Sequence, residues 1–308
     1  MAHRFIYKRG RVVVISGAIY GYIFGGGDSA FANVNIADRI VFSTQTNSAL
    51  SSANITSNRS SMSSCTDKVL YGYIKKNTTE GDRITFSTDT TATHTNSKLS
   101  TAMDNNFGLS DGTNYGYWCG GWTGSVRSAK VMRITFSTGV LADNASSLSA
   151  ARSDSQPLSD GVTYGYVLGG TSPTVATADR VTFSTSTFAA NSGSNLPAAR
   201  IGGGTFSNGS VAGYQAGGSA NTTTCYKITY STSAASSLGA ILSTARASSQ
   251  QGANTSSVGG YIYGGYVAPN VMSSTDYMTY STETFGLVAT AYPSAARYAA
   301  AGLSDFLV

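Results

Sequence analysis

Apolar and polar residues alternate in short runs along this chain, and the runs recur. In the segment DRITFST, which begins at Asp82, Ile and Phe alternate with Arg and Thr. A period of two is the period of a β-strand, and Tyr, Val, Ile, Thr and Phe favour strands. No long segment has apolar residues at the i, i+3, i+4, i+7 spacing of an amphipathic helix. The pattern predicts an all-β protein built from short strands.

One of these runs occurs six times in the sequence, at intervals of about 48 residues. Its clearest copies read YGYIFGG, YGYWCGG and YGYVLGG, and the Gly pair is missing only from the second copy, YGYIKKN. We expect the Gly pair to allow a tight turn or the close approach of a neighbouring sheet. The second tyrosine is present in every copy: Tyr22, Tyr73, Tyr117, Tyr166, Tyr214 and Tyr261.

Two further elements complete the unit. A DRITFST-like run follows each YGY run, and an arginine precedes most of the YGY runs by 12 or 13 residues. We expect the repeated aspartates to make turn hydrogen bonds and to pair with the Arg that follows them, and the repeated arginines to satisfy carbonyls between sheets. Copy three has Met103 in the arginine's place and copy one has Lys8. The leading arginines are Arg59, Arg152, Arg200 and Arg246, with Arg297 near the end of the chain.

Six units of four short strands predict a six-bladed β-propeller, a ring of four-stranded antiparallel sheets that bury their faces against one another. Residues 297–308 carry a leading arginine without a unit of their own, and RVVVISG near the N-terminus competes for the same place in the first blade. We expect 297–308 to close the ring, to contact a partner or to form a simple extra edge strand. The expected single domain covers 1–308, with blades near 8–58, 59–102, 103–151, 152–199, 200–245 and 246–296.

The order of an Arg-led strand, an aromatic strand ending in Gly-Gly and a third strand resembles the kelch repeat over nearly the whole chain. It departs from that family where Phe-Ser or Tyr-Ser replaces Tyr-Asp and no repeated Trp follows. The pattern GYxxGG, DRITFST, Leu, Ala-Arg is more similar to kelch-like proteins of bacteriophage tails, especially marine and cyanobacterial ones. This resemblance implies a kelch-like propeller in the virion. Its expected partners are other tail proteins, in a homo-oligomeric assembly, and host-surface polysaccharide.

Charge and cysteine usage narrow the possible partners. Only 11% of residues are charged and the net charge is +5, with the densest positive group at Lys8, Arg9 and Arg11, so we expect no nucleic-acid partner. Three widely spaced cysteines argue against a disulfide framework or a zinc site. No apolar run is long enough for a signal peptide or a membrane span. These features fit a virion protein made in the host cytoplasm, without membrane insertion.

The sequence offers little for catalysis. Its two histidines, His3 and His94, cannot form a centre of several histidines, and we expect His94 in a solvated turn. A carboxylate repeated in each blade is expected to be structural, since an active site needs one constellation of groups rather than six. We therefore predict no catalytic, cofactor or metal residues and a protein that is not an enzyme. The alternatives are an intracellular kelch-like adaptor or lectin and, less favoured, a glycan-active enzyme.

The best candidates for contact with a ligand or partner lie near the loops after the Gly pairs, which differ in length and composition and should gather on one rim. Trp122 opens one loop and is expected to pack between blades or to stack on a sugar or a partner. Lys75 and Lys76 replace the Gly pair of copy two and are expected to face a partner or an anionic surface. Arg127 and Lys130 complete the set. The variable loops cover 27–37, 122–131, 171–178, 219–225 and 266–275.

Overall fold

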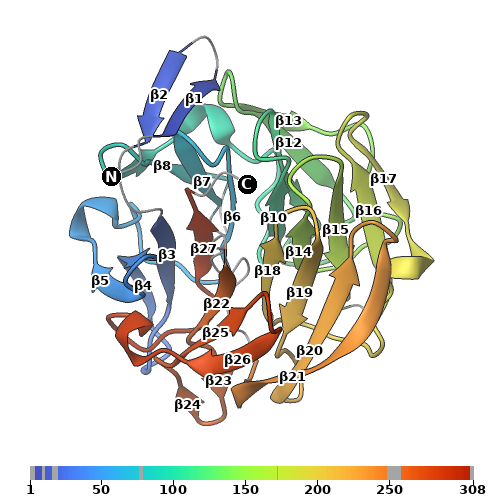
Figure 1. Ribbon diagram of the computed structural model, residues 1–308. Helices are drawn as coiled ribbons and strands as arrows, with labels where there is room; N and C mark the ends of the chain where they lie inside the picture. The colour runs from blue at the N-terminus through green and yellow to red at the C-terminus, as the bar shows by residue number, and fades with distance from the viewer. Residues whose placement is uncertain are drawn as a thin grey trace.

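The computed structural model is a six-bladed β-propeller of antiparallel four-stranded sheets around a central axis (Figure 1). It describes residues 4–8, 11–15, 20–75, 79–171, 173–247 and 258–305. The only helical segments in these ranges are four short 3-10 turns, η1 (Ser51–Ala53), η2 (Thr95–Ser97), η3 (Ser192–Ser194) and η4 (Ala289–Ala291). The prediction of an all-β, six-bladed propeller is confirmed.

In each blade the strands follow one another from the axis outwards. Blade 1 consists of β27 (Ala301–Ser304), β3 (Tyr20–Gly27), β4 (Asn33–Val41) and β5 (Thr46–Ala49). Blade 2 consists of β6 (Ser63–Thr66), β7 (Tyr71–Lys75), β8 (Gly81–Thr85) and β9 (Thr90–Thr93). Blade 3 consists of β10 (Phe107–Ser110), β11 (Tyr115–Cys119), β12 (Val131–Thr135) and β13 (Val140–Asp143).

The second half of the ring follows the same order. Blade 4 consists of β14 (Gln156–Ser159), β15 (Tyr164–Leu168), β16 (Ala178–Thr182) and β17 (Thr187–Ala190). Blade 5 consists of β18 (Gly204–Asn208), β19 (Ala212–Ala216), β20 (Thr222–Thr229) and β21 (Ala234–Arg246). Blade 6 contains β22 (Gly259–Tyr263), β25 (Thr275–Thr279) and β26 (Thr284–Leu287), with the small hairpin β23 (Tyr266–Val267) and β24 (Asn270–Val271) beside them. Residues 248–257, which precede β22, lie outside the described residues.

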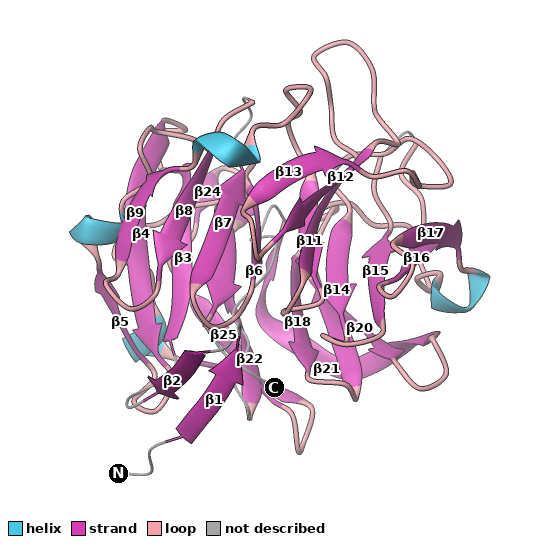
Figure 2. Ribbon diagram, turned by 90° about the horizontal axis from the view of Figure 1, so that it is seen from above, coloured by secondary structure: helices cyan, strands magenta, loops and turns pink. Residues whose placement is uncertain are grey.

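The C-terminal strand closes the ring. β27 pairs with β3, so that the last described strand of the chain becomes the innermost strand of the first blade. The competing N-terminal segment forms β2 (Arg11–Ile15), which pairs with β1 (Arg4–Lys8) in a separate two-stranded sheet. Figure 2, a side view, shows this hairpin below the blades. Of the two candidates for the first blade's inner strand, the segment after Arg297 therefore takes the place.

The carboxylate of Asp305 stabilises the pairing of β27 with β3. The amide of Tyr20, at the start of β3, donates to Asp305 Oδ1 at 2.6 Å. Asp160 makes the same kind of bond inside blade 4, where its Oδ1 accepts from the amides of Val162, Thr163 and Tyr164. Asp305 thus accepts a backbone amide from the start of the second strand, as a turn aspartate does, but here the two residues come from opposite ends of the chain. Partial burial, with the like charge of Asp89 nearby, raises the pKa of Asp305 to about 7.

The pKa of Asp305 predicts a pH-dependent stability. An aspartate in the unfolded chain has a pKa of about 4. Between about pH 4 and pH 7, Asp305 is therefore protonated in the folded chain and ionised in the unfolded chain. The stability that this proton provides is present below about pH 4 and is lost as the pH rises through about 7. Asp305→Asn keeps an acceptor oxygen for Tyr20 but cannot ionise. We expect the free energy of unfolding of the variant, measured relative to that of the wild type, to be about 1–2 kcal/mol higher at pH 8 than at pH 4.5. Urea unfolding at both pH values measures this, and parallel pH profiles of the two proteins would contradict it.

The glycine of the YGY motif makes room for the neighbouring blade. A Cβ atom built on Gly72 would lie 2.5 Å from Cδ2 of Leu303, which belongs to the inner strand of the preceding blade. The same close approach recurs around the ring between a YGY-position glycine and the preceding inner strand. The pairs are Gly116 with Cys65, Gly165 with Leu109, Gly213 with Leu158 and Gly260 with Phe206.

The two tyrosines of the motif serve different contacts. In blade 4, the guanidinium of Arg180 lies over the ring of the first, Tyr164, at 4.2 Å. The hydroxyl of the second, Tyr166, is 2.9 Å from Ser233 Oγ in the outer turn of blade 5, and Arg180 donates to that same oxygen at 3.1 Å. The equivalent turn residues Asp89 and Ser186 likewise contact two groups from the preceding blade. In blade 6 the turn residue is Glu283, and its carboxylate accepts hydrogen bonds from the Tyr214 hydroxyl and from Lys227 Nζ.

The Gly pair joins successive blades, as expected. Gly169 and Gly170 have φ angles of +59° and +110°, which side chains other than glycine rarely adopt. This turn lets the amide of Gly170 donate to the carbonyl of Arg200, the leading arginine of the next blade, at 2.8 Å. Equivalent bonds run from Gly26, Gly121, Gly218 and Gly265 to the carbonyls of Arg59, Arg152, Arg246 and Arg297.

The leading arginines form buried ion pairs, but not with the partner we expected. Arg152 Nη2 lies 3.0 Å from Asp179 Oδ2, and both side chains are almost fully buried. Arg246 pairs with Asp276 and Arg297 with Asp38 in the same way. Each of these three aspartates therefore pairs with the leading arginine of its own blade, and the Arg or Tyr that follows it in the sequence points to the opposite face of the strand. The leading arginine's guanidinium also donates to carbonyls of its own blade, for Arg152 those of Gly169 and Thr177.

Three blades depart from this pairing. In blade 3 the arginine and aspartate positions carry Met103 and Met132, which are buried in one cluster with Leu99. In blade 5 Arg200 instead donates to the hydroxyls of Thr224 and Tyr226. In blade 2 Arg59 is half-buried and donates to the carbonyl of Asn58, while Asp82 accepts from Thr56. In blade 3 the two positions thus change together, whereas in blade 5 the arginine is kept and Tyr226 stands in the aspartate's place.

Candidate functional site

The propeller has two different rims. The variable rim carries the loops between the second and third strands, together with the segments that lead to each inner strand. The turn rim, on the opposite side, carries the tight turns from inner to second strand, such as residues 160–163, and the hairpin β1–β2. The expected gathering of variable loops on one rim follows directly from this strand order.

Three predicted contact residues lie together on the variable rim of blade 3. Trp122 is half-buried, and the guanidinium of Arg127 lies 5.3 Å from the centre of its ring. Lys130 Nζ makes an ion pair with Asp143 at 2.9 Å and donates to Ser100 at 2.7 Å. One face of the tryptophan is therefore already occupied by Arg127. Their role in binding stays a prediction.

Lys75 does not lie on a surface. Its side chain is fully buried, with Nζ 5.1 Å from the centre of the Trp118 ring in the next blade. A Cβ on Gly81 would lie 2.7 Å from Nζ, so the ammonium group is enclosed between two blades. Our expectation that this lysine faces a partner is therefore wrong, because its long side chain fills the space beside the indole ring. Lys76 lies outside the described residues.

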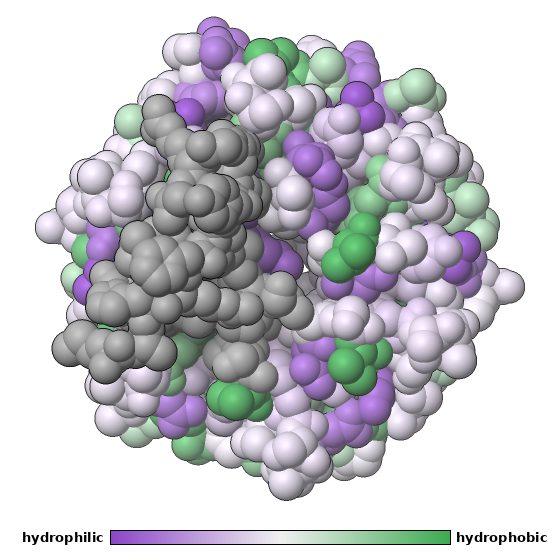
Figure 3. Space-filling model, turned by 45° about the horizontal axis from the view of Figure 1, so that its top comes forward, coloured by the Kyte–Doolittle hydropathy of each residue, from purple (hydrophilic) through white to green (hydrophobic). Residues whose placement is uncertain are grey.

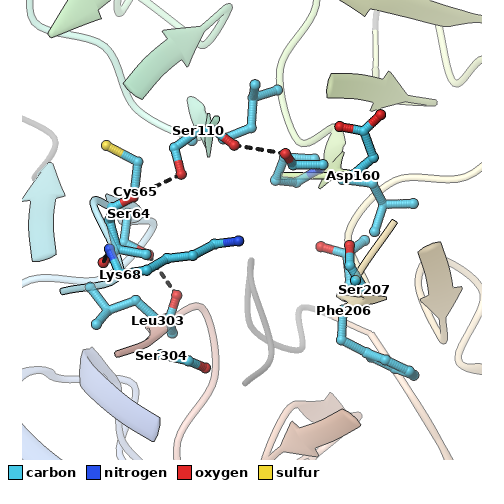
Figure 4. Close-up of a pocket in the computed structure, with 18 residues that line it drawn as sticks. Ser64, Cys65, Lys68, Ser110, Asp160, Phe206, Ser207, Leu303 and Ser304 are labelled. Carbon is cyan, nitrogen blue, oxygen red and sulfur yellow. Dashed lines mark hydrogen bonds between the residues drawn. The ribbon is translucent and has the colours of Figure 1, made fainter. Parts of the chain in front are cut away.

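A cavity of the described chain lies on the axis, near the turn rim (Figure 4). It has a volume of about 160 Å³ and is lined by residues of the inner strands β27, β6, β10, β14 and β18 and of the turns that follow them. Figure 3 shows a hollow near the centre of a face on which hydrophobic groups are scattered among hydrophilic and neutral ones. The lining residues with hydroxyl groups are Ser64, Thr66, Ser110, Ser159, Thr205, Ser207 and Ser304.

Several of these hydroxyls bind the neighbouring inner strand. Ser159 Oγ donates to the carbonyl of Ser110 at 2.7 Å, and Ser110 Oγ donates to the carbonyl of Thr66 at 2.9 Å. In the later blades a tyrosine takes over, since the Tyr230 hydroxyl donates to the carbonyl of Ser159 at 3.0 Å and is 2.7 Å from Ser207 Oγ. The channel wall is therefore a continuous hydrogen-bonded belt in these blades, and these hydroxyl protons already have acceptors.

Lys68 is the cation of this cavity. Its side chain extends towards the middle of the cavity in Figure 4. It passes the turn glycine of blade 3 and reaches that of blade 4, since a Cβ on Gly112 would lie 2.7 Å from Cε and one on Gly161 2.9 Å from Nζ. The amide of Lys68 donates to Thr66 Oγ1 at 2.8 Å, and Asp160 lies on the same lining. Hydroxyl groups and one ammonium group suit the binding of a small polar group rather than covalent chemistry.

Other ionisable groups are placed for packing. His94, expected in a solvated turn, precedes η2 but is half-buried, with its ring edge-on to Tyr73 at 5.5 Å. Burial lowers the pKa of His94 to about 4. Burial also raises the pKa of the Cys65 and Cys119 thiols. Across the described ranges, no three His, Cys, Asp or Glu side chains are grouped closely enough to hold a metal ion.

Comparison with known proteins gave no further assignment. The sequence matches no known protein family and no curated protein. In the described part of the chain, no helix has the length and apolar character needed to cross a membrane. The fold is therefore established by the structure alone. The hydrogen-bonded belt of hydroxyl groups around the axial cavity was not predicted from the sequence. Its signal was the recurrence of Ser or Thr before Asp or Asn at the end of each described inner strand, as at Ser110, Ser159 and Ser304.

Proposed function

We propose that this chain is a non-catalytic virion protein of a bacteriophage tail, in which a kelch-like propeller serves as a binding module. It attaches the particle to host-surface polysaccharide or docks to other tail proteins. The sequence resemblance to kelch-like tail proteins motivates this assignment. A binding role of this kind fits the general use of β-propellers as binding modules.

One structural observation supports the proposal most. The repeated charged and hydroxyl groups are engaged in contacts within and between blades, as in the Arg152–Asp179 pair and the Tyr166–Ser233 contact. The variable loops differ in sequence from blade to blade on one rim. A rigid ring that carries diverse loops is the arrangement of a recognition scaffold, because binding residues concentrate on loops held by rigid elements.

The particle itself provides the test. We expect mass spectrometry of purified virions to find this protein in fixed proportion to the other tail proteins, and antibodies against the purified protein to label the tail. Labelling at the capsid or absence of the protein from virions would contradict the assignment. A host-cell lysate fraction from the same preparation is the control for carry-over of unassembled protein.

A further inference from the structure

Three aromatic rings meet on the variable rim at the seam between blades 1 and 6. The Phe31 ring centre lies 5.7 Å from that of Tyr266 and 5.9 Å from that of Tyr298, and the two tyrosines are 6.1 Å apart. Phe31 comes from the loop after the first Gly pair, Tyr266 from β23 and Tyr298 from the segment before β27. We call these three residues the seam cluster. They come together only because the last strand of the chain closes the ring.

Phe31 is presented to solvent by a constrained loop. Its side chain is 54% exposed, and its φ angle of +61° is unusual for a bulky side chain. Asp28 holds this shape, since its Oδ1 accepts from the amides of Ala30 and Ala32 at 2.9 Å each, and its carbonyl accepts from the amide of Phe31 at 3.0 Å. An exposed phenyl ring held in an uncommon backbone conformation loses little further freedom on binding.

The two tyrosines form the fixed base of the cluster. Tyr298 exchanges backbone hydrogen bonds with Gly27, and a Cβ on Gly27 would lie 2.6 Å from Cζ of the Tyr298 ring. Tyr266 exchanges backbone hydrogen bonds with Ala247. Both tyrosines are half-buried. Tyrosine suits a site that is apolar at one end and wet at the other, because its ring packs while its hydroxyl can still hydrogen-bond.

The surroundings favour a small neutral ligand. The loop residues 27–32, 264–274 and 298–300 carry one charge, that of Asp28, and are otherwise small, apolar, hydroxyl or amide side chains. In the described loops that carry the seam cluster, Phe31 is the exposed large hydrophobic residue; elsewhere near this rim are Val126 of blade 3, Ile241 in β21 and Leu287 at the end of β26. A protein interface of standard size buries about 800 Å² per partner around several anchors, whereas the described loops of the seam cluster carry one exposed large hydrophobic residue, Phe31.

We propose that the seam cluster is a carbohydrate-binding site that takes one neutral sugar residue of a surface glycan. The apolar C–H face of the sugar ring would lie on Phe31, with the tyrosine hydroxyls available to its hydroxyl groups. This inference rests on the proposed function and names the site and the ligand class for attachment. It replaces Trp122 as the expected sugar platform, since Arg127 already covers one face of that indole.

The probe is a printed array of purified polysaccharides and lipopolysaccharides, followed by competition with free glucose, galactose and N-acetylglucosamine. We expect the wild-type protein to bind a subset of the array and Phe31→Ala to weaken that binding at least about tenfold. Val126→Ala removes an exposed apolar side chain from the same rim and should bind like the wild type. Because both residues are exposed, both variants should melt within about 1–2 °C of the wild type.

The outcomes separate this site from the wider proposal. Equal binding by the wild type and Phe31→Ala, with loss in Trp122→Ala, would overturn the seam cluster and keep glycan attachment. No binding of the wild type to any sugar on the array would overturn the carbohydrate site. The tail assignment would then be decided by the virion analysis alone, because a tail protein that docks to other proteins would still be found in the particle.

Discussion

A chain that ends at Arg297 is expected to melt about 10 °C or more below the full-length protein. The truncation removes β27, which supplies four register partners to β3 and buries Leu303 and Ala301 in the core between blades 1 and 2. Loss of a buried leucine alone costs about 2–5 kcal/mol, and for a chain of this size each 1 kcal/mol corresponds to about 2–4 °C. Differential scanning calorimetry measures the change.

Three further samples make this result specific to ring closure. Deletion of residues 1–15 removes β1 and β2, which pair with no described blade, and should shift the melting temperature by less than about 2 °C. Leu303→Ala keeps the backbone pairing and should fall between the wild type and the truncation. A synthetic peptide of residues 298–308 should restore part of the loss in the truncated chain. An unchanged melting temperature after truncation would show that the ring is stable without its last strand.

The ring itself could be predicted because its signals are local. Each strand has its own period of two, and the same units recur about every 48 residues, so the number and order of strands follow from the letters. The identity of the closing strand could not be decided in this way. RVVVISG and the segment after Arg297 are both good strands, and the choice depends on which one reaches β3 in the folded ring.

The partner of each aspartate was mispredicted for a reason already present in the strand period. Asp179 and Arg180 are neighbours on β16, and neighbouring side chains of a strand point to opposite faces. Asp179 therefore meets Arg152 from the segment that leads the blade, while Arg180 lies over Tyr164. Applying the alternation to the charged residues as well as to the apolar ones would have excluded the pairing that we expected.

The candidate sites were harder to predict because they combine distant segments. Lys75 was expected on the surface, but the burial of its side chain depends on Trp118 of the next blade. The seam cluster draws Phe31 and Tyr298 from opposite ends of the chain. No local pattern marks such contacts, and only the closed ring brings them together. Trp122 and Arg127, by contrast, lie in one loop and were found from the sequence.

Arg152→Met is expected to destabilise the protein by about 3–5 kcal/mol, because it leaves the fully buried carboxylate of Asp179 without its ion-pair partner. The double variant Arg152→Met/Asp179→Met should recover most of this loss. Blade 3 already has this solution, since Met103 and Met132 occupy the same two positions. Replacing a buried ion pair by apolar side chains of similar volume is often neutral or stabilising.

Urea unfolding followed by intrinsic fluorescence measures the two variants against a matched surface pair. Lys130→Met breaks the ion pair with Asp143, whose side chains are 32% and 55% exposed, and should cost less than about 1 kcal/mol. A double variant as unstable as Arg152→Met alone would point to another cause. The bonds from Arg152 to the carbonyls of Gly169 and Thr177 would then be the stabilising contacts, and charge pairing would contribute little. Recovery in the double variant would instead show that the arginine and the aspartate act as one interchangeable unit, as the paired methionines of blade 3 indicate.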